Sequence, residues 1–171
     1  MEGKDEIDAL AERWAGAGMP PARIAGLELS KRVSRLDGIL ESALKQELGT
    51  LGLTYAEFDV LAALHRVGPP YRMKPSELSR SLLLTSGGIS NVLQRLTAAG
   101  HVERAANPGD ARSRWVQLTP AGLELAGKAM NLSTAVHDEV LADVDPAALR
   151  AAADALREVL LAMNRRRRFT P

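Results

Sequence analysis

The sequence of 171 residues has no cysteine and few aromatic residues. Without cysteine, the chain has no disulfide framework, no thiol nucleophile and no cysteine-ligated zinc or iron–sulfur site. Its histidines are far apart in the sequence, which argues against a histidine metal site: they are His65, His101 and His137. Aromatic residues make up only 4% of the chain while alanine and leucine abound, so the composition predicts helices packed through aliphatic side chains.

Long hydrophobic runs are also missing. No apolar stretch is long enough to cross a bilayer and the N-terminus is acidic, so we expect a cytoplasmic protein with no secretory signal and no membrane partner. We find no paired carboxylates suited to acid–base catalysis, no phosphate-cradling loop before a helix and lysine, and no nucleophile with a plausible base. The sequence therefore predicts a protein that is not an enzyme and needs no cofactor.

The most informative stretch extends from residue 85 to residue 118. It begins with a predicted helix, in which Thr85 or Ser86 can cap the first amides and Gly100 can end the helix in the left-handed conformation. One face carries apolar residues at three- and four-residue spacing: Ile89, Leu93 and Leu96. The opposite face carries small, polar or cationic residues: Ser86, Gly87, Ser90, Asn91, Gln94 and Arg95.

That polar face has two interpretations. It is either an ordinary solvated face or a DNA-reading surface, where glycines at the helix start let the backbone approach a phosphate. The following segment favours DNA, because residues 101–105 and 114–118 are predicted to pair as strands around the Asn107–Asp110 turn. Arg112 and Arg114 then lie near a projecting hairpin.

Flanking segments complete a winged helix-turn-helix. A short helix over 75–83 precedes the reading helix, and a capping box formed by Thr54 and Glu57 opens an earlier helix that extends to residue 67. From Tyr71 to Trp115 the chain has seven basic and three acidic residues, although its net charge is only +1. This local excess is typical of nucleic-acid binding. Arg165–Arg168 is interpreted as a mobile tail or as further phosphate contacts.

Long helices are predicted on both sides of this module. An N-terminal helix over 5–17 precedes a long helix that begins near residue 22, and further helices begin at Pro120 and Pro146. The last helix has a wide apolar stripe, which either packs on its own core or joins the first long helix in a two-fold dimer. We therefore predict a mainly α fold with a small β-wing and with dimerisation helices at both ends. It is one structural domain, divided into 1–49, 50–119, 120–164 and a basic tail, 165–171.

The chain resembles the MarR (multiple antibiotic resistance regulator) family of winged-helix transcription factors. The likeness lies in the order of elements, in Asp110-Ala-Arg112-Ser113, and in the Leu118-Thr-Pro-Ala-Gly122 that follows. The resemblance implies a homodimer that binds double-stranded DNA, with recognition helices in the major groove and wing arginines in the minor groove. A two-fold dimer places its recognition helices roughly 34 Å apart, so we expect a pseudo-palindromic operator.

The resemblance also implies which residues meet DNA. The positions that match the recognition helix are Ser86, Gly87, Gly88, Ser90, Asn91 and Arg95, and those that match the wing are Arg112 and Arg114. We expect Arg95 and Arg80 to contact phosphates, while base edges are probed by Ser90, Asn91 and Gln94. Lys74 and Ser76 complete the predicted DNA-binding set, and Asp110 is expected to orient Arg112 through a salt bridge.

A narrower likeness is to a urate-responsive, PecS-like subgroup that has an extra N-terminal helix. Trp14, Asp59 and Arg104 match its ligand positions, whereas Val92 stands where that subgroup has an arginine. The resemblance implies a small anionic or aromatic effector that displaces an ion pair and moves the recognition helix. In the alternative interpretation, Trp14 only packs and Asp59 is a structural partner of Arg104.

Together these features predict a ligand-responsive transcriptional regulator, usually a repressor. The alternative is a winged-helix scaffold for protein contacts that does not bind DNA, and the basic middle segment argues against it.

Overall fold

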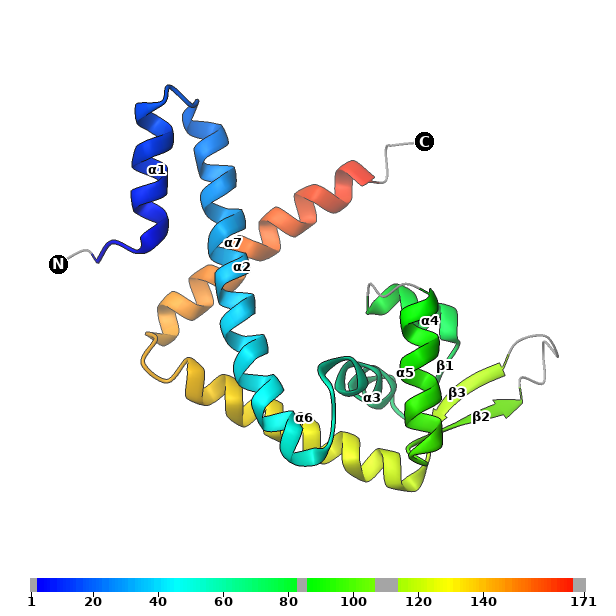
Figure 1. Ribbon diagram of the computed structural model, residues 1–171. Helices are drawn as coiled ribbons and strands as arrows, with labels where there is room; N and C mark the ends of the chain where they lie inside the picture. Colours follow the sequence, from blue (N-terminus) through cyan, green and yellow to red (C-terminus); the bar gives the residue numbers. More distant parts are fainter. Residues whose placement is uncertain (1–2, 83–85, 107–113, 168–171) are drawn as a thin grey trace. The chain divides into compact units, whose positions relative to one another are not determined.

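The computed structural model describes residues 3–82, 86–106 and 114–167. The predicted fold class is confirmed, because the chain is mainly helical with a small antiparallel sheet (Figure 1). Its helices are α1 (Glu6–Gly16), α2 (Pro21–Leu48), the 3-10 turn η1 (Gly49–Leu51), α3 (Tyr55–Arg66), α4 (Pro75–Ser81), α5 (Ser86–Ala98), α6 (Pro120–Val140) and α7 (Pro146–Arg167). Its strands are β1 (Arg72–Met73), β2 (Val102–Ala106) and β3 (Arg114–Leu118).

The chain divides into two units, Met1–Val136 and His137–Pro171. The second unit consists of the end of α6 and α7, which carries exposed apolar side chains at Leu160 and Met163. No described helix is both long enough and apolar enough to cross a membrane.

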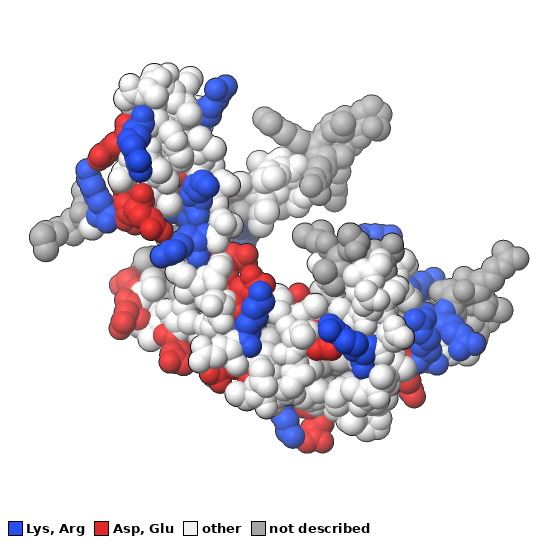
Figure 2. Space-filling view, in the orientation of Figure 1, with Lys and Arg blue, Asp and Glu red and all other residues white. Residues whose placement is uncertain are grey.

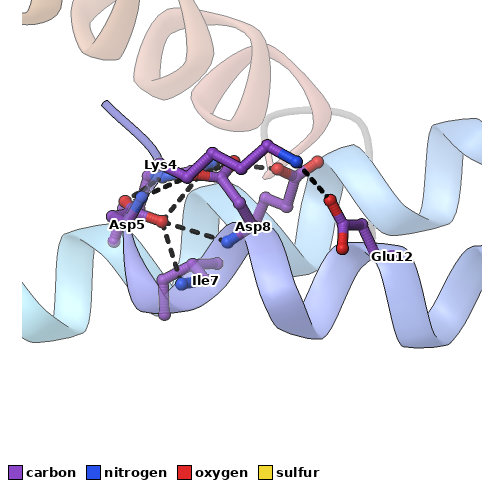
Figure 3. Close-up of polar contacts among 7 residues, drawn as sticks. Lys4, Asp5, Ile7, Asp8 and Glu12 are labelled. Atoms are coloured by element: carbon purple, nitrogen blue, oxygen red, sulfur yellow. Dashed lines mark hydrogen bonds and ion pairs between the residues drawn. The ribbon is translucent and has the colours of Figure 1, made fainter. Parts of the chain in front are cut away.

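Side chains at the helix starts satisfy amides that have no partner within the helix. Asp5 accepts hydrogen bonds from the amides of Ile7 and Asp8, at 2.9 and 3.0 Å (Figure 3). The predicted capping box is confirmed, since Glu57 Oε2 accepts from the Thr54 amide at 2.8 Å and Thr54 Oγ1 accepts from the Glu57 amide at 3.3 Å. These local bonds set where α1 and α3 begin.

The core of the first unit is built around α3. Val60, Leu61, Ala62 and Leu64 on this helix have no exposed surface. They lie among equally buried apolar residues from neighbouring elements: Leu48, Leu78, Leu96 and Val116. Burial of this kind stabilises each large side chain by about 1.5–3 kcal/mol, so α3 anchors the module that carries α4, α5 and the sheet.

The sheet has the order β1-β3-β2, with both pairs antiparallel. The expected strand over 114–118 is confirmed, but the strand expected over 101–105 begins one residue later, at Val102. His101 is outside the strand because its amide bonds to the Leu96 carbonyl at 2.9 Å, closing the end of α5 around Gly100, whose φ is 75°. The sequence did not predict β1, whose two residues are too few to show an alternating pattern.

α1 and α2 form a helical hairpin. Ile7 and Ile24 are buried between them, and Arg32 on α2 pairs with Asp5 at 2.8 Å and with Asp8 at 2.9 Å. The apolar residues of α2 fall into two parts: Leu44 and Leu48 are buried, while Leu29, Val33 and Leu36 remain exposed in the single chain and form an apolar stripe. This stripe therefore has no cover within the first unit.

Candidate nucleic-acid interface

The α4–α5 pair forms the helix-turn-helix, and α5 has a sharp division between its two faces. Its inner face is buried through Ile89, Leu93 and Leu96, as predicted, and also through Val92. Its outer face exposes residues predicted to meet DNA: Gly87, Ser90, Asn91, Gln94 and Arg95. Gly88 is half-buried, and Ser86 is the first residue of the helix. The helix thus presents a continuous polar face.

Burial of Val92 explains why an apolar residue stands at this position. The side chain is 6% exposed among apolar neighbours, where an arginine would leave its charge unpaired in the core. Val92 is therefore a core residue here and not part of the polar face.

Arg95 forms an ion pair with Glu57, a buried residue of α3. Its Nε lies 3.2 Å from Oε1 of Glu57, whose other carboxylate oxygen accepts from the Thr54 amide and hydroxyl. Burial alone would raise the pKa of Glu57, but the Thr54 hydrogen bonds and the charges of Arg95 and His101 overcome this effect and lower it. Glu57 is thus an ionised group that ties the start of α3 to the outer face of α5.

The first helix of the pair, α4, follows β1 directly. Glu77 closes its start by accepting from the Lys74 amide at 2.9 Å. Ser76 and Arg80 are exposed, while Lys74 is half-buried. α4 and α5 pack against each other, so these residues belong to the same helix pair or directly precede it.

On the sheet, Arg114 begins β3 and is exposed. Arg104 on β2 is also exposed, and it lines a groove of about 490 Å³ together with residues of α5: Ser90, Gln94, Thr97 and Ala98. Arg104 therefore lies beside the polar face of the recognition helix. The predicted turn at 107–110, together with Thr85, Asp110 and Arg112, lies outside the described residues.

The three predicted effector residues are not brought together in the described part of one chain. Trp14 is near the turn between α1 and α2, Asp59 is on α3 and Arg104 is on β2. Burial raises the pKa of Asp59, with Arg66 opposing the rise and Glu41 adding to it. Among the described residues, no ion pair joins Asp59 to Arg104. Glu41 on α2 is close enough to Asp59 to affect its pKa, whereas Trp14 lies near the other end of the same helix. At 1.5 Å per residue, the start of α2 is about 30 Å from Glu41. The effector site remains a prediction.

Sequence reasoning missed one cluster, formed by Arg72, Lys74 and Trp115. The guanidinium carbon of Arg72 lies 5.2 Å from the Trp115 ring centre, and Nζ of Lys74 lies 5.6 Å from it. Lys74 was predicted as a DNA-binding residue, but Arg72 was visible only as part of the basic excess and no pattern placed either beside Trp115. Their meeting with Trp115 depends on pairing between β1 and β3, which are about forty residues apart in sequence.

Comparisons with known proteins agree with this geometry. A sequence model described as MarR family matches residues 51–113. The chain is 29% identical over 123 residues to the HTH-type transcriptional regulator PecS of Dickeya dadantii, covering 72% of this chain and 74% of that protein. It is 32% identical over 108 residues to the HTH-type transcriptional repressor Rv2887 of Mycobacterium tuberculosis, covering 63% and 76%.

Solved structures show the same fold. A point mutant of Escherichia coli MarR complexed with operator DNA has a TM-score of 0.69 and 26% identity, covering 77% of this chain and 93% of that one. AbsC, a MarR family transcriptional regulator of Streptomyces coelicolor, has a TM-score of 0.70 at 23% identity, covering 85% and 97%. These relatives are transcriptional regulators and not enzymes. The chain therefore belongs to the MarR family of winged-helix transcriptional regulators.

Proposed function

We propose that this protein binds a pseudo-palindromic operator in duplex DNA as a homodimer and represses transcription there. The observation that carries the proposal is the division of α5: its apolar face is buried in the module and its polar face, including Asn91 and Gln94, is exposed. Amide side chains on an exposed helix can pair with adenine edges in the major groove.

Charge supports the same function. Lysine and arginine side chains gather at the right of Figure 2, beside the strands. Cations placed along a surface bind phosphates and release counterions from the DNA. This release supplies most of the affinity that does not depend on the DNA sequence. The near-neutral net charge of +1 does not weaken this argument, because binding depends on where the charges lie.

Uncovered apolar surface supports a dimer. On α2, Val33 is 42% exposed and Leu36 is 43% exposed, and on α7, Leu160 is 58% exposed and Met163 is 55% exposed. Large apolar side chains in contiguous helical stripes usually mark an interface. We infer that a second copy covers them, because one two-fold interface both buries these stripes and pairs two recognition helices.

Repression is proposed because the mycobacterial relative is named as a repressor. A dimer seated on a promoter occupies the same DNA surface that other proteins need. We also propose that a small anionic effector modulates binding, as the likeness to the PecS-like subgroup implies.

DNase footprinting on the DNA upstream of the protein's own gene tests the proposal. We expect protection of an inverted repeat whose half-sites are about 10 base pairs apart, centre to centre. The double variant Asn91→Ala, Gln94→Ala should lose the footprint, whereas Asn131→Ala on the exposed surface of α6 should keep it. Absence of protection and of any salt-dependent duplex binding by the wild-type protein would favour the protein-interaction scaffold instead.

A further inference from the structure

Two cations share one indole ring at the base of the wing. Arg72 and Lys74 approach the Trp115 ring to 5.2 and 5.6 Å, within the range of cation–π attraction. We call these three residues the Trp115 platform. Its members come from β3, from β1 and from the residue that immediately precedes α4.

Strand pairing explains how the platform is assembled. Arg72 pairs with Gln117 and Met73 with Val116, so continuing the antiparallel pairing by one residue places Lys74 opposite Trp115. Side chains alternate between the two faces of a sheet, so Arg72, Lys74, Trp115 and Gln117 share one face, while Val116 points into the core on the other. The two cations are thus fixed on the outer face.

The Trp115 platform shares its face of the sheet with an acidic residue, Glu103, which pairs with Gln117 on the side of β3 away from Arg72. In the part of the chain that the structure describes, neither Arg72 nor Lys74 forms an ion pair with a carboxylate. The two cations beside one ring repel each other, and the ring's attraction for an exposed cation is weak. An anion between them would remove the repulsion and gain two charge-assisted hydrogen bonds.

We propose that the Trp115 platform is a phosphate clamp for the DNA backbone. Arg72 and Lys74 donate hydrogen bonds to phosphate oxygens, and Trp115 is the positioning residue that holds both cations in place. The inference rests on the proposed DNA binding. It favours DNA over an acidic protein because the platform joins the sheet of the wing to α4, whose Ser76 and Arg80 are exposed.

The indole acts through its ring face. Trp115 Nε1 is buried and, among the described residues, has no hydrogen-bond partner, so no polar bond fixes the ring. Phenylalanine would retain a π face without the unsatisfied N–H, whereas leucine would fill apolar space with no π face. Trp115→Phe and Trp115→Leu therefore separate ring chemistry from packing.

The test is the salt dependence of binding to a mixed-sequence duplex of about 30 base pairs, long enough for a two-half-site footprint. Each lost phosphate contact should reduce the slope of log K against log salt by about 0.9. In a homodimer each substitution removes one contact from both protomers, so Arg72→Ala and Lys74→Ala should each reduce the slope by about 1.8. The exposed Arg23→Ala on α2 should leave the slope unchanged. Trp115→Leu should reduce the slope by about 1.8 to 3.6 although it removes no charge, while Trp115→Phe should stay near the wild-type slope.

Further outcomes decide the proposal even if Trp115→Leu is poorly folded, because the Arg72 and Lys74 variants leave the core intact. An unchanged slope in both of those variants overturns the clamp. A folded Trp115→Leu protein with weaker binding but the wild-type slope overturns the positioning role. A wild-type protein without salt-dependent duplex binding rejects the proposed function itself, which is a separate result.

Discussion

Arg95, on the exposed face of α5, is bound by Glu57, a residue with 9% exposure that also closes the capping box of α3. The Nε–Oε1 distance is 3.2 Å. One carboxylate therefore joins the start of the central helix to a cation predicted to contact phosphate. The pair orients Arg95, so a phosphate contact by Arg95, as predicted, requires DNA to compete with Glu57 for the guanidinium.

Substitution of Glu57 should lower the free energy of unfolding and release Arg95 from its ion pair. Glu57→Ala loses the bond to the Thr54 amide and the ion pair, so we expect a loss of about 1–3 kcal/mol in the free energy of unfolding. Urea denaturation measures this loss. As a control, Glu124→Ala removes only an exposed i,i+4 pair with Lys128 and should change stability by less than about 0.5 kcal/mol. Equal effects of the two variants would contradict the structural role of Glu57.

The lowered pKa of Glu57 predicts how this contribution depends on pH. Because the folded pKa lies below the unfolded value, the ionised carboxylate stabilises the fold fully above the unfolded pKa of about 4.3. The contribution should disappear as pH falls through the folded pKa. Denaturation of wild type and Glu57→Gln between pH 7 and pH 3 should show a difference that is constant near neutrality and shrinks in acid. A difference that grows in acid would contradict the assignment.

Asp59 should show the opposite sign. Its pKa is raised, mainly by burial, so the charged form is less stable in the folded protein than in the unfolded chain. Asp59→Asn should therefore raise the urea midpoint at pH 7, and this advantage should vanish below the unfolded pKa of about 3.9. If the substitution lowers the midpoint at pH 7, Asp59 has a stabilising partner that the described contacts do not include.

Gly122 should tolerate no side chain. A Cβ at this position would overlap the backbone oxygen of His101, where α6 passes the end of α5. Gly122→Ala should cost about 1–3 kcal/mol through overpacking. Gly127, one and a half turns further along α6, has open space, so Gly127→Ala should stabilise the helix by up to about 1 kcal/mol. Thermal unfolding of the pair tests this contrast, and similar shifts in both would contradict it.

The fold was largely predictable because its signals are local. The Thr54–Glu57 capping box, the left-handed Gly100 and the proline at the start of α6 each lie within a few residues of the helix end that they mark. The buried face of α5 followed in the same way from the spacing of Ile89 and Leu96. Such features depend on residues close together in the sequence, so they can be recognised without knowledge of the tertiary fold.

Contacts between distant segments were not predictable in this way. The pairing of β1 with β3, the pair between Glu57 and Arg95, and the two cations beside Trp115 each require the tertiary fold. The predicted Trp14–Asp59–Arg104 site was inferred only from family resemblance, and it likewise depends on contacts between distant elements, α1, α3 and β2.

The dimer can be tested on the exposed stripe of α2. Leu36→Glu places a charge on a surface that we expect a second copy to cover, so sedimentation should show mostly monomer. Lys31→Glu, on the exposed surface of the same helix, should leave the dimer largely intact. A Leu36→Glu protein that remains dimeric would show that the dimer interface does not include this stripe.

The most direct measurement for the central claim is the salt dependence of wild-type binding to the upstream DNA and to a scrambled duplex. We predict that log K falls linearly and steeply with log salt for both duplexes. The upstream sequence should bind at least about 10³-fold more tightly than the scrambled one at the same salt concentration. Binding that is absent, or that does not change with salt, would contradict the assignment of this chain as a DNA-binding regulator.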